Sequence, residues 1–358
     1  MLPQLLYRGS VKDLHGSPAD ETLVFAFSDR YSVFDWGEMP DAIGNKGKAL
    51  AAITFGLFRH LSSKGIEHHC LGLVDRDMVP LLNPSPSRFL KVKQVQVLRP
   101  IRHANTWDYS LYQQRPSACL VPLEVIFRFG LPRGSSLLRR LQENPAYAAE
   151  LKLPAEIKEG SVFAAPLIEY SSKLEESDRI LTRQEAQQLA GMSDKEFTLL
   201  ASLAQKISLH LHEFFASFDV ELWDGKLEFA FTATTLGSRS FTLVDAIGPD
   251  ELRLIYRGIP LSKELIRQFY LHTPWYQAIK QAQTLAKEKK STAWRELCRL
   301  QLGALPAPLS DQQIQVVSGI YQNIADFTLE ACGLRPWFTD KLAFKQVCTL
   351  AENFNALS

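Results

Sequence analysis

Residues 220–231 read Val-Glu-Leu-Trp-Asp-Gly-Lys-Leu-Glu-Phe-Ala-Phe, and this stretch carries the signal of a β-hairpin. Apolar and polar residues alternate on both sides of Asp224-Gly225, as they do along half-buried strands. Asp-Gly between two alternating segments is the strongest short-range signal of a β-hairpin. The stretch therefore predicts a turn at Asp224-Gly225 and a strand over residues 226–231. Another strand is predicted over residues 241–247, which read Phe-Thr-Leu-Val-Asp-Ala-Ile.

The two predicted strands would bring two acidic side chains together. If residues 226–231 pair antiparallel with residues 242–247 through the connection 232–241, Glu228 lies opposite Asp245. Like charges directly opposite each other destabilise a sheet, and a buried carboxylate pair needs a proton or a cation. A hard divalent cation such as Mg²⁺ prefers carboxylate oxygens. This register therefore predicts a magnesium site at Glu228 and Asp245.

The same two residues have a simpler interpretation, in which both carboxylates are solvated on an exposed face. The apolar neighbours Leu227, Phe229 and Leu243 favour a sheet that is at least half buried. A β-bulge in the connection would shift the register and separate Glu228 from Asp245. The spacing alone leaves both interpretations open.

Other segments carry patterns of their own. Apolar or alternating runs predict strands over residues 23–27, 89–98 and 118–128, and residues 49–60 have a helical pattern. Residues 99–117 are polar and irregular, and they predict a long loop. The chain is therefore expected to mix short strands and helices from its N-terminal third onward.

The C-terminal half carries the clearest helix signals. Residues 193–196 read Ser-Asp-Lys-Glu, which matches the capping box that begins a helix. The pattern from about residue 266 onward is mostly helical, and it is broken at Pro274 and at residues 305–308. Asp311 is predicted to cap the last helices.

Composition excludes several classes of protein. With 358 residues, of which 46% are hydrophobic and 22% charged, the chain is long enough to bury a large core. Its 40 basic and 39 acidic residues leave a net charge of +1, so composition indicates neither nucleic acid nor an anionic membrane as a partner. Neither an apolar run of about 20 residues nor a signal-peptide pattern is found. The five cysteines have no C-x-x-C spacing and indicate reduced thiols, hence a cytoplasmic protein.

Two groups of residues indicate anion binding. Residues 7–13 read Tyr-Arg-Gly-Ser-Val-Lys-Asp, a glycine with basic neighbours that can bind phosphate, and the alternative is an ordinary surface turn. The second group suits a small anionic substrate, although each of its basic side chains taken singly is more often a solvated charge. Its members lie beside glycine or polar turns and are Arg30, Lys46, Arg128, Arg133, Ser135 and Ser136.

These stretches together resemble one family, phosphoribosylaminoimidazole-succinocarboxamide synthase (SAICAR synthetase) of purine biosynthesis. The matches follow the family's order over roughly residues 5–270, and the run Ser28-Asp-Arg-Tyr-Ser-Val-Phe-Asp35 is quite specific. The other matching stretches are Leu6-Tyr-Arg-Gly-Ser-Val-Lys-Asp-Leu14, Ile43-Gly-Asn-Lys-Gly47, Val121-Pro-Leu-Glu-Val-Ile-Phe-Arg128, Pro166-Leu-Ile-Glu-Tyr-Ser-Ser-Lys173, Lys226-Leu-Glu-Phe229 and Val244-Asp245 with Pro249-Asp250.

The resemblance implies an α+β fold in three parts. These are an N-terminal, mainly antiparallel sheet domain (residues 1–115), a larger nucleotide-binding domain like those of kinases and ATP-grasp enzymes (116–265), and a helical C-terminal region (266–358). It implies ATP and Mg²⁺ as cofactors, and a ligase that joins a carboxyaminoimidazole ribonucleotide to L-aspartate through an acyl phosphate. The implied partners are these small molecules, and a homo-oligomer stays open.

The resemblance also implies roles for individual residues. The expected catalytic residues are Lys12, Asp35, Lys46 and Arg128. The expected nucleotide-binding residues are Gly9, Ser10, Val11 and Lys12, together with Glu228 and Asp245 as the metal ligands. The expected substrate-binding residues are Asp35, Lys46, Arg128, Ser135, Arg253, Lys263 and Arg267.

Several site positions depart from the family's pattern. Ser10 stands where a lysine is usual, Ala246 where a glutamate is usual, and Ser262 where an aspartate is usual. The usual Pro-Gly-Lys-Gly reads Gly-Asn-Lys-Gly at residues 44–47. These changes leave two alternatives open: a related ATP-dependent carboxylate–amine ligase or phosphotransferase with another substrate, and a nucleotide-binding homologue without catalysis.

Overall fold

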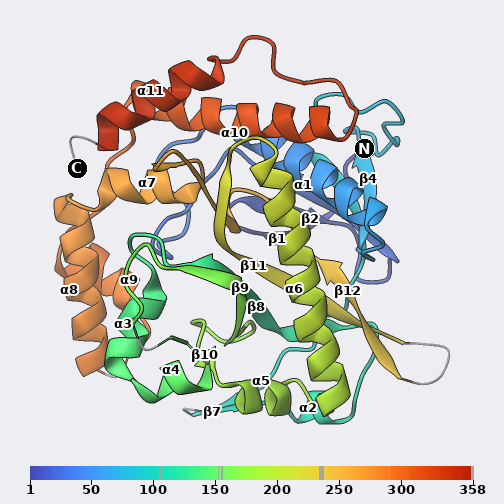
Figure 1. Cartoon of the computed structure of the whole chain (residues 1–358), viewed down its shortest axis with the longest axis vertical. Coiled ribbons are helices and arrows are strands. Elements are labelled where there is room, and N and C mark those ends of the chain that lie inside the picture. The colour runs from blue at the N-terminus through green and yellow to red at the C-terminus, as the bar shows by residue number, and fades with distance from the viewer. Residues whose placement is uncertain (105, 152, 155, 234–237, 290, 356–358) are drawn as a thin grey trace.

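Two antiparallel sheets, with helices packed around them, make up the fold in the computed structural model (Figure 1). The structure describes residues 1–104, 106–151, 153–154, 156–233, 238–289 and 291–355. Within that part of the chain, every helix is too short or too polar to cross a lipid bilayer. The predicted α+β class is confirmed, whereas the division of the chain into three parts stays a prediction.

The smaller sheet comes from the N-terminal part of the chain, in the strand order β1-β2-β3-β5-β4. Its strands are β1 (Leu5–Arg8), β2 (Lys12–His15), β3 (Thr22–Phe27), β4 (Cys70–Val74) and β5 (Phe89–Lys93). β-Branched and aromatic residues favour the extended chain of β3. The strand predicted at residues 23–27 is confirmed, and the one predicted at residues 89–98 ends early, at Lys93.

The larger sheet has the strand order β10-β9-β8-β11-β13-β14. β13 pairs with the first part of β11, and β12 pairs with the later part of the same strand. Its strands are β8 (Leu120–Gly130), β9 (Val162–Ser172), β10 (Ile180–Leu181), β11 (Glu221–Ala233), β12 (Arg239–Val244), β13 (Leu252–Tyr256) and β14 (Ile259–Pro260). The strand predicted at residues 118–128 is confirmed as β8. Every residue of β8 is buried, which explains why its sequence is a continuous apolar run.

The turn predicted at Asp224-Gly225 is wrong. β11 runs through both residues without a break. An added Cβ at Gly225 would lie 2.6 Å from the side chains of both Leu252 and Phe127. Glycine is therefore required here by close packing within the sheet, and the Asp-Gly pair has no turn to form.

The predicted register between the acidic strands is wrong by one residue. Glu228 pairs with Val244 instead of Asp245. Asp245 lies just past the end of β12 with a left-handed φ of 64°, which breaks the alternation of the strand and returns its carboxyl group to that of Glu228. The two carboxyl groups are therefore adjacent because of the backbone conformation of Asp245, and not because their residues pair across the strands. Residues 234–237 of the predicted connection 232–241 lie outside the described residues.

The long loop predicted at residues 99–117 contains regular structure. It holds a two-stranded hairpin of β6 (Ile101–His103) and β7 (Thr106–Asp108), followed by the one-turn helix α2 (Ser110–Gln113). Elements this short leave no hydrophobic period in the sequence, because a single hairpin or turn buries too few residues to show one.

The remaining helices are α1 (Lys46–Ser63), α3 (Ser136–Glu143), α4 (Ala146–Glu150), α5 (Arg183–Leu189), α6 (Asp194–Ala216), α7 (Lys263–Tyr270), α8 (Pro274–Glu288), α9 (Trp294–Glu296) with the π-helical turn Leu297–Gln301, α10 (Asp311–Ala331) and α11 (Phe344–Asn355). The predicted capping box of α6 is confirmed, with Ser193 as the N-cap. The predicted cap of α10 is wrong by one residue. Ser310 is the N-cap, its hydroxyl accepts a hydrogen bond from the Gln313 N–H, and Asp311 is the first helical residue.

Helix α10, from the C-terminal part of the chain, packs side by side with α1 (Figure 1). One buried apolar cluster includes residues from β3, from the larger sheet and from α10 and α11, between Phe25 and Ala351 in the chain. Helices from the two ends of the chain therefore share one core with the sheets. This packing holds the N-terminus of α1 against the segment that follows β12.

The α1–α10 contact depends on Gly56, where an added Cβ would lie 2.6 Å from Thr328 Cγ2. We predict that Gly56→Ala lowers the free energy of unfolding by about 1–3 kcal/mol, although alanine is normally the better helix former. Urea denaturation followed by circular dichroism measures this loss.

The matched control for this clash is Thr328→Ser, which removes the methyl group and keeps the hydroxyl that donates to the Ile324 carbonyl at 2.7 Å. In the Thr328→Ser background, Gly56→Ala should leave the free energy of unfolding unchanged. An equal loss in both backgrounds would show that the contact with Thr328 is not its cause.

Candidate active site

A pair of carboxyl groups lies where β12 ends beside β11. Glu228 and Asp245 share a hydrogen bond between their side chains. Each also contacts a lysine: Lys173 Nζ lies 2.6 Å from Glu228 Oε1, and Lys12 Nζ pairs with Asp245 Oδ1. The Glu228 side chain is 13% exposed and that of Asp245 is 25% exposed. The predicted pair therefore exists in space, largely removed from solvent.

The surroundings give the two carboxyl groups opposite pKa shifts. Burial raises the pKa of Glu228 to about 7, and the neighbouring charge of Asp245 adds to this rise. Burial also opposes ionisation of Asp245, but Lys12 and Lys173 outweigh it and hold its pKa below the ordinary range. The buried pair therefore resists carrying two negative charges, and a hard cation is a suitable partner for both carboxyl groups.

Two lysines and a third acidic residue surround this pair. Glu124 lies opposite Glu228 in the pairing of β8 with β11, where like charges would repel. Lys173 Nζ lies 3.3 Å from Glu124 Oε1 and so bridges the two acids, and Lys226 Nζ lies 2.8 Å from Glu124 Oε2. Glu124, Lys173 and Lys226 all stand in stretches that match the family, but the sequence predicts no role for them. The signal that could have found them is the pairing of β8 with β11.

The turn between β1 and β2 brings Lys12 to the carboxyl pair. The Gly9 N–H donates to the Lys12 carbonyl at 3.0 Å, and an added Cβ at Gly9 would lie 2.5 Å from that oxygen, so the turn requires glycine. The Val11 carbonyl accepts hydrogen bonds from the N–H and hydroxyl of Ser28, at 2.9 and 2.8 Å. Ser10 is exposed in this turn. The structure thus places the predicted phosphate-binding residues in one turn.

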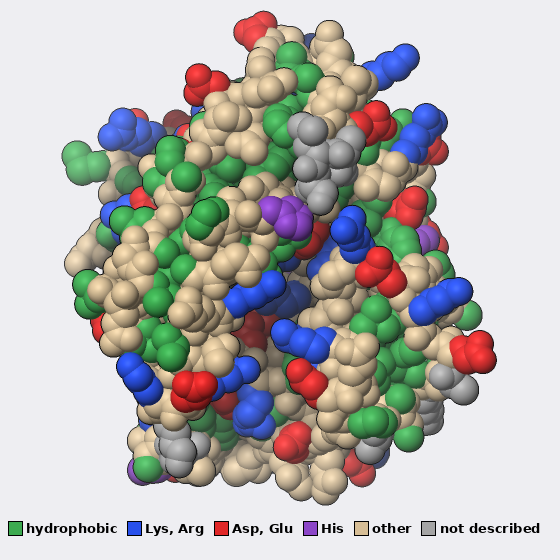
Figure 2. Space-filling view, turned by 90° about the vertical axis from the view of Figure 1, so that its left-hand side faces the viewer, with side chains coloured by type: hydrophobic (Ala, Val, Ile, Leu, Met, Phe, Trp, Pro, Cys, Tyr) green, Lys and Arg blue, Asp and Glu red, His purple; other side chains and the backbone are tan. Residues whose placement is uncertain are grey.

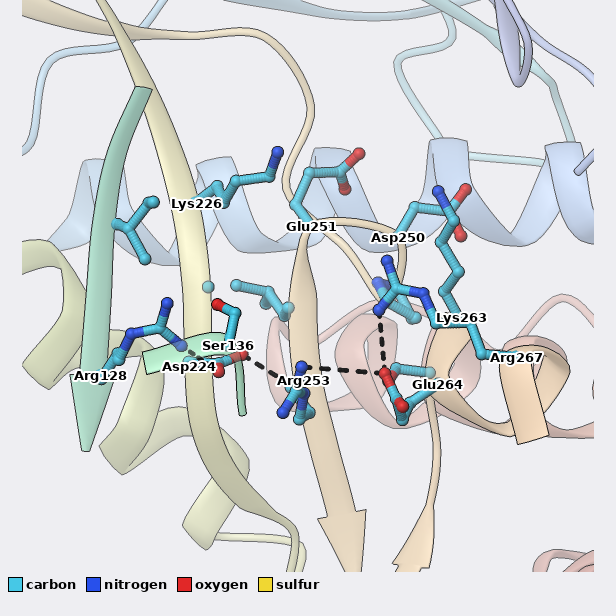
Figure 3. A pocket seen from close by; sticks show the side chains of 15 residues that line it. Arg128, Ser136, Asp224, Lys226, Asp250, Glu251, Arg253, Lys263, Glu264 and Arg267 are labelled. Atoms are coloured by element: carbon cyan, nitrogen blue, oxygen red, sulfur yellow. Dashed lines mark hydrogen bonds and ion pairs between the residues drawn. The ribbon is translucent and has the colours of Figure 1, made fainter. Parts of the chain in front are cut away.

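A pocket of about 210 Å³ lies between the larger sheet and α7 (Figure 3). Figure 2 shows a hollowed face of the molecule with Lys and Arg side chains around the hollow and Asp and Glu among them. The charged residues that line the pocket are Arg128, Asp224, Lys226, Asp250, Glu251, Arg253, Lys263, Glu264 and Arg267. A lining with both signs of charge suits a ligand that carries anionic groups and an amine.

Acidic and basic side chains alternate along one wall of this pocket (Figure 3). Asp224 accepts a hydrogen bond of 2.9 Å from Arg128 Nη1, and its other oxygen lies 3.5 Å from Arg253 Nε. Glu264 lies 3.8 Å from Arg253 Nη2 and 2.9 Å from Arg267 Nη1. Arg253 Nη1 is buried and has no hydrogen-bond partner among the described residues. The wall therefore keeps a donor on Arg253 for an anionic ligand.

Arg128 is held in place from the neighbouring strand β9. Its Nε contacts Glu169, which also accepts hydrogen bonds from Arg140 at 2.6 Å and from the Tyr147 hydroxyl at 2.9 Å. Burial acts against the charged form of Arg128, but Glu169 and Asp224 outweigh it and raise its pKa. The guanidinium thus stays charged and fixed in orientation at the pocket wall.

Lys46 is not one of the residues that line the pocket in the described part of the chain. Its fully buried Nζ lies 2.6 Å from Asp250 Oδ2, and the Tyr321 hydroxyl donates to Asp250 Oδ1 at 2.6 Å. Burial acts to raise the pKa of Asp250, but Lys46 and Lys263 outweigh it and lower that pKa. Asp250 lines the pocket, so Lys46 reaches it through Asp250. Sequence reasoning missed Tyr321, because it lies in α10, outside every matching stretch.

Three more of the predicted residues have different surroundings. Asp35 is exposed. Burial and the charge of Glu124 raise the pKa of Asp178, and the charge of Asp35 adds to this rise. The Ser135 hydroxyl is buried without a hydrogen-bond partner in the described part of the chain. Lys263 lines the pocket, and burial lowers its pKa. The structure thus places Lys263 in the pocket wall, whereas Asp35 and Ser135 lie outside that lining.

The family model described as SAICAR synthetase matches residues 5–281. The chain belongs to the SAICAR synthetase family. A putative phosphoribosylaminoimidazole-succinocarboxamide synthase of Archaeoglobus fulgidus is 37% identical over 321 residues, which cover 88% of this chain and 91% of the relative. This similarity extends into the C-terminal region beyond the matched family segment.

Two solved SAICAR synthetases share the fold. The enzyme from Saccharomyces cerevisiae, solved with SAICAR, has a TM-score of 0.62 at 20% identity, over 93% of this chain and 96% of that one. A type-2 SAICAR synthetase in complex with ADP has a TM-score of 0.53 at 22% identity, over 84% and 99% of the two chains. The predicted SAICAR synthetase-like fold is therefore confirmed.

The structure accounts for one departure from the family's usual residues. Asn45, at the position where this SAICAR synthetase family usually has glycine, has a left-handed φ of 62°, a conformation that asparagine tolerates better than most residues. Ser10 is exposed, whereas Ala246 and Ser262 are buried. Neither of these buried residues supplies a charge to the site.

The buried pair of Lys46 and Asp250 predicts a pH-dependent loss of stability. Lys46→Met should lower the free energy of unfolding by about 3–5 kcal/mol at pH 7, because Asp250 is left as a buried charge without its cation. The folded-state pKa of Asp250 is lowered, so the pair stabilises the fold above the ordinary pKa of 3.8. The difference between wild type and variant should shrink as the pH falls below that value. Urea denaturation at pH 7 and pH 3 measures it.

The matched control is the double variant Lys46→Met with Asp250→Asn, which removes the unpaired charge. It should lose less stability at pH 7 than the single variant. Equal losses would contradict the assignment of the cost to an uncompensated carboxylate.

Proposed function

We propose that this chain catalyses the ATP-dependent joining of a carboxyaminoimidazole ribonucleotide to L-aspartate, with release of ADP and phosphate. The observation that carries the proposal is the Glu228–Asp245 pair, with Lys12 beside it and a pocket of alternating charges formed by the same sheet. Membership in the SAICAR synthetase family supports the same reaction.

The carboxyl pair fits a magnesium ion. Burial and the charge of Asp245 oppose ionisation of Glu228, while Lys12 and Lys173 favour the charged form of Asp245. A cation bound between the two carboxyl groups would relieve this repulsion. Among the described residues, no group of three His, Cys, Asp or Glu side chains is placed to hold a metal ion. Such a sparse donor set suits Mg²⁺, which is usually bound through one or two carboxylates, waters and substrate phosphates. When bound, Mg²⁺ would neutralise charge on the ATP phosphates.

A small apolar cluster next to the carboxyl pair suits the base of the nucleotide. Its buried members are Leu120, Ala230 and Val244, with Val95 and Leu174 packed against them. Val244 pairs directly with Glu228, and Ala230 lies two residues after Glu228 on β11. Val244, Ala230 and Glu228 therefore share one face of the sheet. We place the base on this cluster and the phosphates near the turn of Gly9, Ser10, Val11 and Lys12.

The pocket beside α7 supplies cations for the other two substrates. We assign Arg128, Arg253, Lys263 and Arg267 to the phosphate and carboxylates of the ribonucleotide and aspartate. Lys46 would act through Asp250. Asp35 and Ser135, which lie outside the pocket lining, would meet the substrates only at its edges.

The chemistry that this arrangement serves is carboxylate activation. A carboxylate is a poor acceptor for an amine, because an oxide ion is a poor leaving group. Transfer of the γ-phosphoryl group gives an acyl phosphate, from which the amine displaces phosphate. Positioned cations lower the barrier by holding the reacting groups together and by stabilising the charge that develops on them.

Two expectations from the sequence stay predictions. All five cysteines are free thiols, in keeping with the expected cytoplasmic location. The assembly state, for which a homo-oligomer was left open, is a matter for measurement in solution.

The carboxyl pair gives the first test. Glu228→Gln and Asp245→Asn should each weaken Mg²⁺-dependent ATP binding at least about tenfold, because each removes one metal ligand. Isothermal titration calorimetry with and without Mg²⁺ measures this. The control is Glu330→Gln, an exposed carboxylate at the end of α10. Unchanged ATP binding in both site variants would refute the metal assignment.

Steady-state assays test the reaction itself. ADP release should require both the ribonucleotide and aspartate. ADP release with a different amine or carboxylate would favour the related ligase, and ATP binding without ADP release would favour a non-catalytic homologue.

A further inference from the structure

The pocket beside α7 has four acidic residues in its wall, and three of them are held by cations. Asp224 lies against two arginines, Glu264 against two arginines, and Asp250 against a lysine and a tyrosine. Glu251 differs, because its Oε2 is buried and has no hydrogen-bond partner among the described residues. Of these four carboxylates, Glu251 is therefore the one left available to a ligand.

The backbone holds Glu251 firmly in place. Its N–H donates to the Gly248 carbonyl at 3.0 Å, and its carbonyl accepts a hydrogen bond of 3.2 Å from the Lys226 N–H on β11. Figure 3 shows the Glu251 carboxylate between Lys226 and Asp250. The residue thus presents its carboxylate from a fixed segment of backbone.

Glu251 is distinct from the carboxyl pair assigned to Mg²⁺. Within the described residues, it does not form a metal-binding group with Glu228 and Asp245. Its place in the molecule is the wall of the substrate pocket.

Charged groups from several elements act on Glu251. They are Lys12 from β2, Lys46 from α1, Asp245 and Asp250 from the segment after β12, Lys263 from α7, and Tyr321 from α10. Burial has the largest effect, Asp250 adds to it, and together they raise the pKa of Glu251 to about 8 in spite of Lys12. A carboxylate with such a pKa can both take up and release a proton near neutral pH.

The proposed reaction needs a proton acceptor. At neutral pH the amino group of aspartate is an ammonium ion, which has no lone pair and cannot attack a carbonyl carbon. We propose that Glu251 is the general base that takes the proton from this ammonium group. The inference rests on the function proposed above and adds a catalytic residue to it.

The step balances without any further reactant. One ammonium proton passes to the Glu251 carboxylate, and the freed lone pair forms a bond to the carbonyl carbon of the acyl phosphate. The bond between that carbon and the phosphoryl oxygen then breaks. A second proton leaves the nitrogen with the departing phosphate, and Glu251 returns its proton to solvent.

The test compares two nucleophiles. Hydroxylamine is largely uncharged at pH 7 and attacks an acyl phosphate without a base, giving a hydroxamate. In Glu251→Gln, the aspartate-dependent kcat should fall at least about 100-fold, the usual range for loss of a general base, whereas hydroxamate formation stays within about threefold. Both rates are measured with ATP, Mg²⁺ and the ribonucleotide.

Each other outcome has a defined meaning. An equal loss of both rates would overturn the proposal, because it would place Glu251 in formation of the acyl phosphate. An unchanged aspartate rate would also overturn it. If the wild-type protein yields neither product nor hydroxamate, the proposed function is wrong, and the role of Glu251 as its general base is wrong as well.

Two further variants guard against a folding defect. Glu251→Asp keeps a carboxylate and should recover part of the aspartate rate. Glu330→Gln makes the same chemical change on an exposed side chain and should leave both rates unchanged. A Glu251→Asp variant as inactive toward aspartate as Glu251→Gln, with hydroxamate formation intact, would count against proton transfer by the carboxylate.

Discussion

Neutralisation of buried charge determines how the site is built. An ionised side chain removed from water costs several kcal/mol, unless a partner of opposite charge and further hydrogen bonds compensate it. Here the partners come from distant parts of the chain: Lys12 on β2 meets Asp245 after β12, and Lys46 on α1 meets Asp250. The smaller sheet and α1 must therefore lie against the larger sheet in one position, because sliding them apart would leave unpaired charges on both sides.

Local sequence patterns predicted those elements that are stabilised by neighbouring residues in the chain or that are fully buried. The strand at residues 23–27 and the capping box at Ser193 were both recognisable, because β-branched and aromatic residues favour extended chain and the cap is formed within one turn. The meeting of Glu228 with Asp245 was also predicted. Its register was not, because the reversal at Asp245 depends on a single left-handed residue that no periodicity reveals.

Features that depend on the packing of distant segments lay beyond sequence reasoning. Gly225 resembled a turn residue, yet glycine is needed there by the approach of Phe127 and Leu252. The chain of charges from Arg128 to Arg267 requires β8, β11, β13 and α7 to be neighbours, which no local spacing encodes. The unpaired carboxylate of Glu251 became visible only after the partners of its neighbours were known.

The two oxygens of Asp250 are shared between the first residue of α1 and Tyr321 of α10. During synthesis on the ribosome, Lys46 and Asp250 both emerge long before Tyr321. Tyr321 follows Asp250 by 71 residues, so a chain that ended before α10 would lack the hydroxyl that donates to Asp250 Oδ1. Such a chain would keep Lys46 at one oxygen of Asp250, while the other oxygen of this carboxylate in the pocket wall would have lost its hydrogen-bond donor.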